Sequence, residues 1–554
     1  MKKIYLLVAA IIFSVNVNAQ TPAWLWAKGM GGGGSDGGNS LITDANGNIY
    51  TTGTFVDIVD FDPGAGVFNL TSANGSFDVF VSKTDSGGNF VWAKAIGGID
   101  TDNGRSIAFD PSGSGAVYIS GHFRGTTDFD PGAGVFNLTS ATPGYSDIFI
   151  CKLDTSGNFI WAKTMGGAED DAGYSITIDP AGTGAVYCMG YFRATVDFDP
   201  GAGVFNLTSA GNTDIFVSKY SSSGNLIWVK AMRGTGYDWG IFIARCPAGS
   251  TDVYTTGYFS GTVDFDPGTG TYNMTSAGSD DIFISKLDSA GNFIWAKALG
   301  GTDGDYATSI ASDISGNVYT TGNFKLTADF DPGAGTYNLI STSGSNDIFI
   351  SKLDSSGNFV WAKKIGGSTY DTGNDIIVDP FGNIYTIGGF TGMVDFDPGV
   401  GVAVFTSGGN IDIFISRMDS SGNFVWAQHA VGANADNGRS FAFDAAGYLY
   451  ATGSFSSTTL IFTSATSLTN AGQSDIFIAK LDAVFPTGIE TISNFQFSIS
   501  IFPNPFSEEL IISSSEFGDK AEIKIYDMFG RIIYSQKLLT ANCKLQTGRT
   551  EFIS

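Results

Sequence analysis

The order of apolar and polar positions predicts a chain built almost entirely of short β-strands. Runs such as DIFISKLD and NFVWAK are apolar at consecutive positions, a pattern typical of strands that are buried on both faces. Turns of the form Asp-x-x-Gly-Asn separate neighbouring runs and favour antiparallel hairpins. No run beyond the N-terminal segment approaches the roughly 20 apolar residues of a membrane helix, so we expect no transmembrane span.

These runs recur at an interval of about 67 residues, a repeat length that indicates a solenoid or a propeller. Four main strands fit into each unit, and an unpaired strand stands at each end of the repeats, at 24–28 and at 475–482. We therefore predict an all-β fold, a seven-bladed β-propeller of four-stranded antiparallel blades that is closed by pairing of its first and last strands. The repeated tryptophans are Trp26, Trp92, Trp161, Trp228, Trp295, Trp361 and Trp426, and we expect them and the repeated tyrosines to pack between blades.

Units of the form Y-x-T-G-x-F, followed by D-x-F-[IV]-x-K-L-D-x-x-G-N-F-x-W-A-K, resemble the SBBP-type bacterial β-propeller repeat over about residues 24–484. The resemblance implies a propeller and an exported protein. It implies no defined activity and therefore assigns no catalytic residue.

The two ends of the chain differ from the repeats. Residues 1–19 combine two lysines, an apolar run and small residues, as a secretory signal does, and we expect cleavage before Gln20. Residues 20–484 form the predicted propeller, 485–495 a linker, and 496–554 a small β-sandwich-like domain. Within this domain, PNP at 503–505 and IKIYDMFGRII resemble the sorting domain of the type IX secretion system. That resemblance implies passage by the secretion machinery to the outer surface, with release or attachment there. The family's closing strands are missing after LQTGRTEFIS, so we expect an incomplete domain.

The net charge of −25 lies in the repeats, where every acidic residue except Glu169 is Asp. Short carboxylates either accept hydrogen bonds from turns or bind hard cations. A surface of this sign excludes nucleic acid as a partner.

Six units contain the segment Asp-Phe-Asp-Pro-Gly. The two carboxylates point to one side of an extended chain, about 6.6 Å apart, while the Phe packs inward and Pro-Gly forms a type II turn. Two interpretations stay open: the carboxylates cap backbone N–H groups of the turn, or they bind calcium with the help of carbonyl groups. The candidate metal ligands are Asp60, Asp62, Asp128, Asp130, Asp197, Asp199, Asp264, Asp266, Asp329, Asp331, Asp395 and Asp397.

A second series of aspartates lies ten residues after each repeated Trp, in the loop that leads to the innermost strand. We expect these residues to ring the channel mouth on an acidic face, where they tie each loop to the adjacent blade or bind a cation or polar ligand. They are Asp36, Asp102, Asp171, Asp238, Asp305, Asp371 and Asp436. Trp239 follows one of them where no other unit has a Trp, and an exposed ring there could stack on a sugar.

No catalytic set is evident, because His122 and His429 fall at different repeat positions without a nucleophile nearby. We therefore expect a monomeric, non-catalytic surface or secreted binding or scaffold protein with a glycan or protein ligand. Two alternatives stay open: a calcium-stabilised adhesin or lectin, and a polysaccharide-processing enzyme that uses channel-mouth aspartates.

Overall fold

The computed structural model describes residues 21–482, with gaps at 111, 113–114, 180–181 and 246–250, and the backbone of four strands between 509 and 546. The predicted signal segment 1–19 and the linker 485–495 lie outside the described residues. Apart from two single 3-10 turns, η1 (Ala73–Gly75) and η2 (Thr342–Gly344), every described element is a strand. No described helix is long and apolar enough to cross a membrane.

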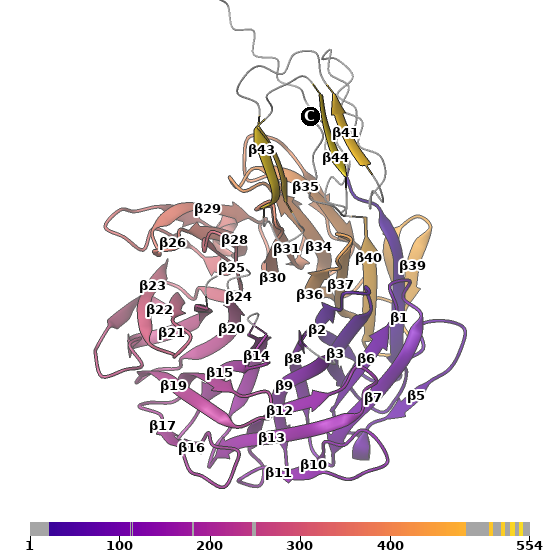
Figure 1. The fold of residues 1–554 in the computed structure, drawn as a ribbon, viewed down its shortest axis with the longest axis vertical. Helices are drawn as coiled ribbons and strands as arrows, with labels where there is room; N and C mark the ends of the chain where they lie inside the picture. The colour runs from indigo at the N-terminus through magenta and orange to yellow at the C-terminus, as the bar shows by residue number, and fades with distance from the viewer. Residues whose placement is uncertain are drawn as a thin grey trace, which may run out of the picture.

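The strands form a ring of sheets around a central axis, as a β-propeller does (Figure 1). The innermost strands surround the axis and follow the Gly-rich loops of the repeats. They are β2 (Gly37–Thr43), β8 (Asn103–Asp110), β14 (Ala172–Ile178), β20 (Trp239–Arg245), β24 (Tyr306–Ser312), β30 (Thr372–Val378) and β36 (Asp436–Phe443).

Each innermost strand pairs with the next strand along the chain, which carries the repeated Tyr. These second strands are β3 (Ile49–Phe55), β9 (Ala116–Arg124), β15 (Val186–Phe192), β21 (Val253–Asp264), β25 (Val318–Lys325), β31 (Ile384–Phe390) and β37 (Leu449–Phe455).

The third strands are the predicted DIFI runs, and most of their residues are buried. They are β6 (Asp78–Thr84), β12 (Ser146–Leu153), β18 (Asp214–Tyr220), β22 (Asn273–Leu287), β28 (Asn346–Leu353), β34 (Asp412–Met418) and β40 (Asp475–Leu481). The outermost strands carry the repeated Trp. They are β7 (Phe90–Gly98), β13 (Phe159–Gly167), β19 (Leu226–Gly234), β23 (Phe293–Gly301), β29 (Phe359–Ile365), β35 (Phe424–Ala430) and β1 (Trp24–Gly32).

The predicted pairing of the first and last strands is confirmed. β1 pairs antiparallel with β40, with Lys28 opposite Ile478 and Met30 opposite Ile476. In Figure 1 the N-terminal strand, drawn in indigo, lies beside the orange strands of the last repeat. The pairing joins segments about 450 residues apart in the sequence, so the ring closes through backbone hydrogen bonds.

A short hairpin links each sheet to its neighbour, and in six of the seven units it is built from the Asp-Phe-Asp-Pro-Gly segment. In the second unit, β10 (Thr126–Asp128) pairs with β11 (Asn137–Thr139) and also with the end of β7 from the preceding unit. The corresponding elements are β4 (Ile58–Asp60) with β5 (Asn69–Thr71), β16 (Thr195–Asp197) with β17 (Asn206–Thr208), β26 (Thr327–Asp329) with β27 (Asn338–Ile340), β32 (Met393–Asp395) with β33 (Val404–Thr406), and β38 (Thr459–Thr463) with β39 (Thr466–Thr469). In the fourth unit the hairpin is continuous with β21 and β22.

These links correct the expectation of seven separate four-stranded sheets. Four of the hairpins add to the preceding sheet and β21 reaches β19 directly, so the described residues contain six sheets of four or more strands. The hairpins β32–β33 and β38–β39 form separate two-stranded sheets that meet the preceding unit through single bridges. One of the six has ten strands and three have six strands. Adjacent units are therefore joined by main-chain hydrogen bonds as well as by side-chain packing.

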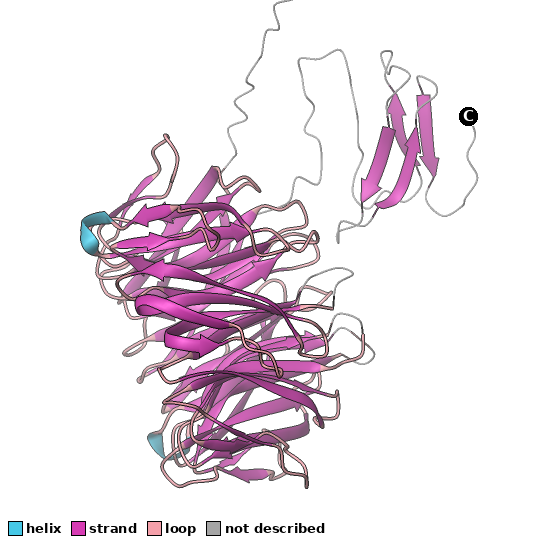
Figure 2. Cartoon of the chain, turned by 90° about the vertical axis from the view of Figure 1, so that its left-hand side faces the viewer, coloured by secondary structure: helices cyan, strands magenta, loops and turns pink. Residues whose placement is uncertain are grey.

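The core lies between the faces of neighbouring sheets, as the consecutive apolar runs predict. One buried cluster combines Tyr118 and Ile148 of the second unit with Ile176 and Phe216 of the third. The turn between the third and outermost strands also contacts the preceding unit. In the second unit, the carbonyl oxygen of Thr155 in this turn accepts a hydrogen bond of 3.2 Å from the Trp92 indole Nε1. The repeated Trp residues thus pack between units, which confirms the prediction made for them. Figure 2 shows these sheets edge-on.

The C-terminal segment contains two separate antiparallel pairs of strands. β41 (Glu509–Ser513) pairs with β44 (Asn542–Gln546), and β42 (Glu522–Tyr526) pairs with β43 (Ile532–Lys537). The second pair flanks the DMFG sequence at 527–530, within the stretch that resembles the sorting domain.

Candidate functional site

The aspartates of the Asp-Phe-Asp-Pro-Gly segments hold the backbone of their own loop. The Asp60 Oδ1 atom accepts hydrogen bonds from the backbone N–H groups of Asp62 and Phe68, at 3.0 and 2.8 Å. The Asp62 Oδ1 atom accepts one from the N–H of Gly64, at 2.8 Å. The same pattern recurs in the other five copies. These contacts agree with the capping interpretation, and among the described residues no group of three or more His, Cys, Asp or Glu side chains could hold a metal ion.

The predicted type II turn is wrong, because Gly64 does not have the positive φ that such a turn requires. The loop needs glycines for space instead: a Cβ atom at Gly66 would lie 2.2 Å from the Asp62 Oδ2 atom. The Phe between the two aspartates does pack inward, as predicted. Phe129 is fully buried, with its ring 5.2 Å from Phe123 and 5.1 Å from Phe149.

The seven loop aspartates predicted at the channel mouth are buried, each with at most 2 % of its surface exposed. The Asp102 carboxylate accepts hydrogen bonds from the N–H groups of Gly98 and Arg124 and from the Thr127 hydroxyl, at 2.8, 3.2 and 3.0 Å. Gly98 belongs to the outermost strand of the preceding unit. The carboxylate therefore ties the loop to the adjacent sheet, and the predicted acidic rim does not form from these residues.

A second buried aspartate, the first residue of each third strand's apolar run, interacts with each loop aspartate. Asp78 is the partner of Asp102, and the Asp78 carboxylate accepts a hydrogen bond of 2.7 Å from the Ala73 N–H. Burial is the largest cause that raises the pKa of Asp102, to about 7; the charge of Asp78 adds to the rise, and the three hydrogen bonds oppose it. Burial likewise raises the pKa of Asp78 to about 7.

The same arrangement leaves carboxylate oxygens without partners between the second and third units. Neither the Asp147 Oδ1 atom nor the Asp171 Oδ2 atom has a hydrogen-bond partner, and both residues are buried. Burial, followed by the charge of Asp147 among the causes that raise it, brings the pKa of Asp171 to about 8. The Gly-Gly sequence that follows the Trp in five of the seven units makes room for this pair: a Cβ atom at Gly166 would lie 1.9 Å from the Asp147 Cγ atom.

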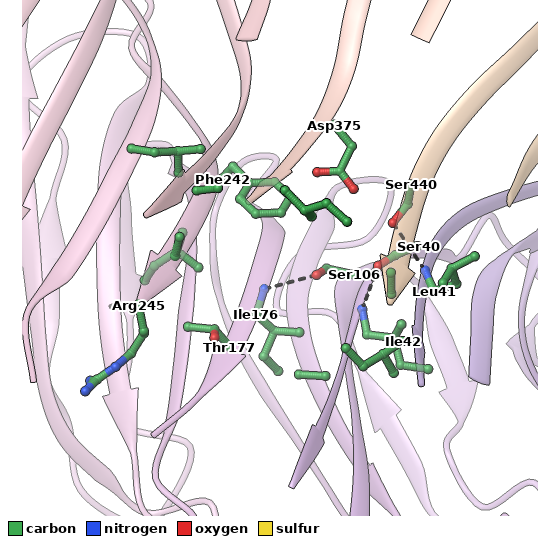
Figure 3. Close-up of a pocket in the computed structure, with 18 of the residues that line it drawn as sticks. Ser40, Leu41, Ile42, Ser106, Ile176, Thr177, Phe242, Arg245, Asp375 and Ser440 are labelled. Atoms are coloured by element: carbon green, nitrogen blue, oxygen red, sulfur yellow. Dashed lines mark hydrogen bonds between the residues drawn. The ribbon is translucent and has the colours of Figure 1, made fainter. Parts of the chain in front are cut away.

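A ring of hydroxyl groups joins the innermost strands around the axis. The Ser440 Oγ atom accepts a hydrogen bond from the Leu41 N–H, and the Ser106 Oγ atom accepts one from the Ile176 N–H (Figure 3). Asp375 replaces the Ser in one unit and accepts from the Phe441 N–H, whereas Phe242 replaces it in another. A cavity of about 530 Å³ lies within this ring, lined mainly by apolar side chains of all the innermost strands.

Each innermost strand contains an irregularity in register, and the extra residue lies three positions after the loop aspartate. In several units its side chain reaches the next strand around the ring: the Asn39 Nδ2 atom donates to the Gly104 carbonyl oxygen, and the Thr308 hydroxyl to that of Gly373. We call these residues the mouth ring. They are Asn39, Arg105, Tyr174, Ile241, Thr308, Asn374 and Arg439.

Trp239 belongs to a chain of aromatic side chains beside the mouth ring, which we call the aromatic belt. The belt consists of Tyr174, Tyr191, Trp239, Tyr258 and Tyr306, all of them partly exposed. The Trp239 ring centroid lies 4.4 Å from that of Tyr191 and 5.8 Å from that of Tyr258, the second pair stacked at 16°. Tyr306 continues the belt, edge-on to Tyr258 at 4.9 Å, and occupies the repeat position of Trp239 in the next unit.

The mouth ring also brings together two arginines that the sequence analysis missed. The Arg105 guanidinium lies 5.1 Å from the centre of the Tyr174 ring. The Arg439 side chain has an exposed surface, but the protein around it desolvates the guanidinium. This desolvation, followed by the charge of Arg105, lowers the pKa of Arg439. An alignment of the repeats at this one position would have revealed both residues, because the other units have uncharged side chains there.

The two histidines do not form a catalytic group. Burial lowers the pKa of His122 to about 3, so its imidazole is neutral at pH 7, and burial also lowers the pKa of His429. Their Nδ1 atoms are buried without a hydrogen-bond partner. Neither ring has the orienting contact that a general base requires.

Comparisons with known proteins agree with both sequence resemblances. Residues 294–323 and 360–388 match the family model of a beta-propeller repeat, and residues 500–549 match that of a secretion system C-terminal sorting domain. The propeller-repeat and sorting-domain resemblances are thereby confirmed.

Two curated proteins are similar in sequence. An uncharacterized WD repeat-containing protein of Acanthamoeba polyphaga mimivirus is 26% identical over 488 residues, which is 73% of this chain and 34% of that protein. The regulatory protein FlaEY of Caulobacter vibrioides is 26% identical over 227 residues, 40% of this chain and 22% of that protein. The chain thus spans about a third or less of the length of these relatives. Among solved structures, Sqt1 from Chaetomium thermophilum matches with a TM-score of 0.35 and 12% identity, over 77% of this chain and 96% of that one.

Proposed function

We propose that this chain is an exported, non-catalytic binding protein, that its seven repeats serve as seven blades, and that its ligand binds at the channel mouth. The observation that carries the proposal is the aromatic belt. Features present in every unit, such as the loop aspartates and the repeated Trp, are accounted for by contacts within the fold. The belt departs from the repeat and is confined to three consecutive units.

The chemistry of the belt suits a ligand with flat, weakly polar faces, such as a saccharide. Aromatic rings offer apolar surface together with hydroxyl and indole N–H groups at their edges. In the other units, the residues at the position of Trp239 and Tyr306 are smaller, namely Gly37, Asn103, Ala172, Thr372 and Asn437. A ligand that covers part of the mouth therefore contacts aromatic surface on one side only.

Burial of the loop aspartates does not support the alternative of a polysaccharide-processing enzyme. Glycoside hydrolysis needs two carboxyl groups that reach the scissile bond, and Asp238, the loop aspartate closest in sequence to Trp239, is fully buried. Export is supported by the match to a sorting domain and by the secretory signal predicted at the N-terminus. Surface attachment and release are both consistent with that match.

The test is a glycan-binding screen of the mature full chain, followed by calorimetry on any saccharide that binds. Truncation of an aromatic side chain at the centre of a binding site raises Kd by about tenfold or more, so we expect Trp239→Ala to do so and Trp239→Tyr to retain most of the affinity. Phe381→Ala is the matched control, because Phe381 is an exposed aromatic residue in the turn at the opposite end of an innermost strand.

Two results would contradict the proposal. One is a screen in which the folded protein binds no saccharide. The other is a ligand whose affinity is lowered equally by Trp239→Ala and by Phe381→Ala, since the site would then lie elsewhere. Thermal melting of each variant shows whether it has folded.

A further inference from the structure

Two positive charges stand in the mouth ring of a strongly negative protein. The chain carries a net charge of −25, with only 29 Lys and Arg residues against 54 Asp and Glu residues. Arg105 and Arg439 nevertheless occupy the same repeat position, in the second and seventh units, with Asn39 of the first unit between them around the ring. Each guanidinium raises the electrostatic potential at the other, which destabilises the unliganded pair.

Neither arginine is neutralised by a carboxylate. The salt bridges found between the described residues include no ion pair with Arg105 or Arg439. The Arg105 Nε atom is buried and has no hydrogen-bond partner. By contrast, Arg124 on the neighbouring strand forms a bond of 3.1 Å to Asp170.

The carboxylates near the aromatic belt are already engaged by other groups. Asp170 accepts hydrogen bonds from Ser146 as well as from Arg124. The Asp280 Oδ2 atom accepts a hydrogen bond of 3.0 Å from the Tyr306 hydroxyl. Asp280 forms no ion pair among the described residues, but it lies beside Tyr306, at the end of the belt away from the arginines. The unpaired positive charges lie at the other end, on the side of the ring that adjoins Tyr174.

We propose that the mouth binds an anionic saccharide, with a carboxylate on Arg105 and Arg439 and a sugar ring on the aromatic belt. Guanidinium groups are suited to carboxylates because their N–H donors match the two oxygens. The contact between Arg105 and Tyr174 joins the cationic and aromatic parts into one continuous surface. A pyranose ring that bears a carboxylate, as in a uronic acid, presents both required groups at one residue. This inference rests on the proposed binding site and adds the charge of its ligand.

The experiment compares trigalacturonate with a neutral galactose trisaccharide, by calorimetry on the mature full chain. We expect the acidic trisaccharide to bind at least tenfold more tightly, and its Kd to rise between 20 and 200 mM salt, because charge attraction is screened. The double variant Arg105→Gln/Arg439→Gln should bind both trisaccharides with similar, weak affinity, since a hydrogen bond to a charged group contributes about a tenfold or larger factor.

Arg233→Gln is the control for the loss of positive charge, because Arg233 is exposed on the outermost strand β19. It should leave the preference for the acidic trisaccharide unchanged. Should the double variant fail to fold, the single variant Arg439→Gln replaces it, since that side chain is exposed and forms no ion pair among the described residues.

The outcomes separate this inference from the proposed function. Equal binding of the acidic and neutral trisaccharides, with loss of both in Trp239→Ala, would overturn the inference and leave the saccharide site in place. Binding of an acidic peptide such as triglutamate, without binding of either trisaccharide, would overturn both. An acid preference that survives the double variant would show that the carboxylate lies elsewhere and would also overturn the inference.

Discussion

Replacement of Asp102 by Asn changes how the stability of the propeller depends on pH. Asp102 is fully buried and accepts hydrogen bonds through both carboxylate oxygens, from Gly98 on one and from Arg124 and Thr127 on the other. Asn keeps the shape but offers only one acceptor. Its NH₂ group would face an N–H donor, which leaves a buried backbone group unpaired.

The size of the pH-dependent change in stability follows from the rise of the Asp102 pKa from 3.8 to about 7, which is caused mainly by burial. Between these two values the folded state holds a proton that the unfolded state has released. The free energy of unfolding therefore falls as the pH rises, by about 1.4 kcal/mol per pH unit for this group. From pH 5 to pH 8 the loss amounts to about 3 kcal/mol, because the fall ends near the folded-state pKa. At pH 5 the unpaired donor in Asp102→Asn costs about 1–3 kcal/mol.

The assay is urea unfolding of the wild type and of Asp102→Asn at pH 5 and at pH 8. The variant should be the less stable protein at pH 5, and the difference should shrink by about 3 kcal/mol, or reverse, at pH 8. The comparison between the two proteins isolates Asp102 from the other buried carboxylates.

Asp85→Asn is the control, because that carboxylate lies in an exposed turn. Burial there is opposed by hydrogen bonds from Asn89 and Gly87, which lower the pKa of Asp85. The stability that those bonds provide is lost only as the pH falls through the lowered pKa, so its effect should be the same at pH 5 and pH 8. A difference between wild type and Asp102→Asn that also stays constant would refute the reasoning, since it would mean that Asp102 is ionised in the fold at pH 5.

Three further predictions concern the repeated features. Gly166→Ala should destabilise the protein by several kcal/mol in urea unfolding, because its Cβ atom would overlap the Asp147 carboxyl group. Gly33→Ala should have little effect, since nothing lies within 4 Å of a Cβ atom there. Equal effects of the two substitutions would contradict this prediction. Ser106→Ala should cost about 1–3 kcal/mol in the same assay by leaving the Ile176 N–H without its acceptor, and an unchanged stability would show that the hydroxyl ring is dispensable. For the calcium interpretation, the melting temperature with 5 mM calcium should equal that with chelator if the aspartates only cap their loops, and a rise with calcium would revive it.

The repeated strands could be predicted from the sequence because their determinants are local. Apolar runs such as DIFI mark strands buried on both faces, and the unpaired strands at the two ends indicate that the ring closes. The bridging hairpins could not be predicted in the same way. β10 has three residues, and its second partner, β7, lies in the preceding unit, so no local pattern indicates the pairing.

The candidate site, too, could be predicted from the sequence only in part. The capping role of Asp60 follows from its place before a Pro-Gly turn, but burial of Asp102 depends on how the loop folds against Gly98 and Thr127. Charge alone suggests an exposed acid there. Arg105 and Arg439 went unnoticed because a search for repeated residues passes over a position where the side chain varies from unit to unit.

That variation indicates where function resides in this fold. A feature kept in every unit, such as the loop aspartate, is buried and makes its hydrogen bonds to the loops and sheets of the ring, so the fold alone explains it. The mouth ring carries no such shared requirement, since its side chains range from Asn39 to Ile241 to Arg439 without loss of the strand pairing beneath them. Chemistry that the fold does not need is concentrated there, with arginine on one side and aromatic rings on the other. A ligand that is anionic at one end and ring-shaped at the other would account for both sides at once, whereas the requirements of sheet packing account for neither.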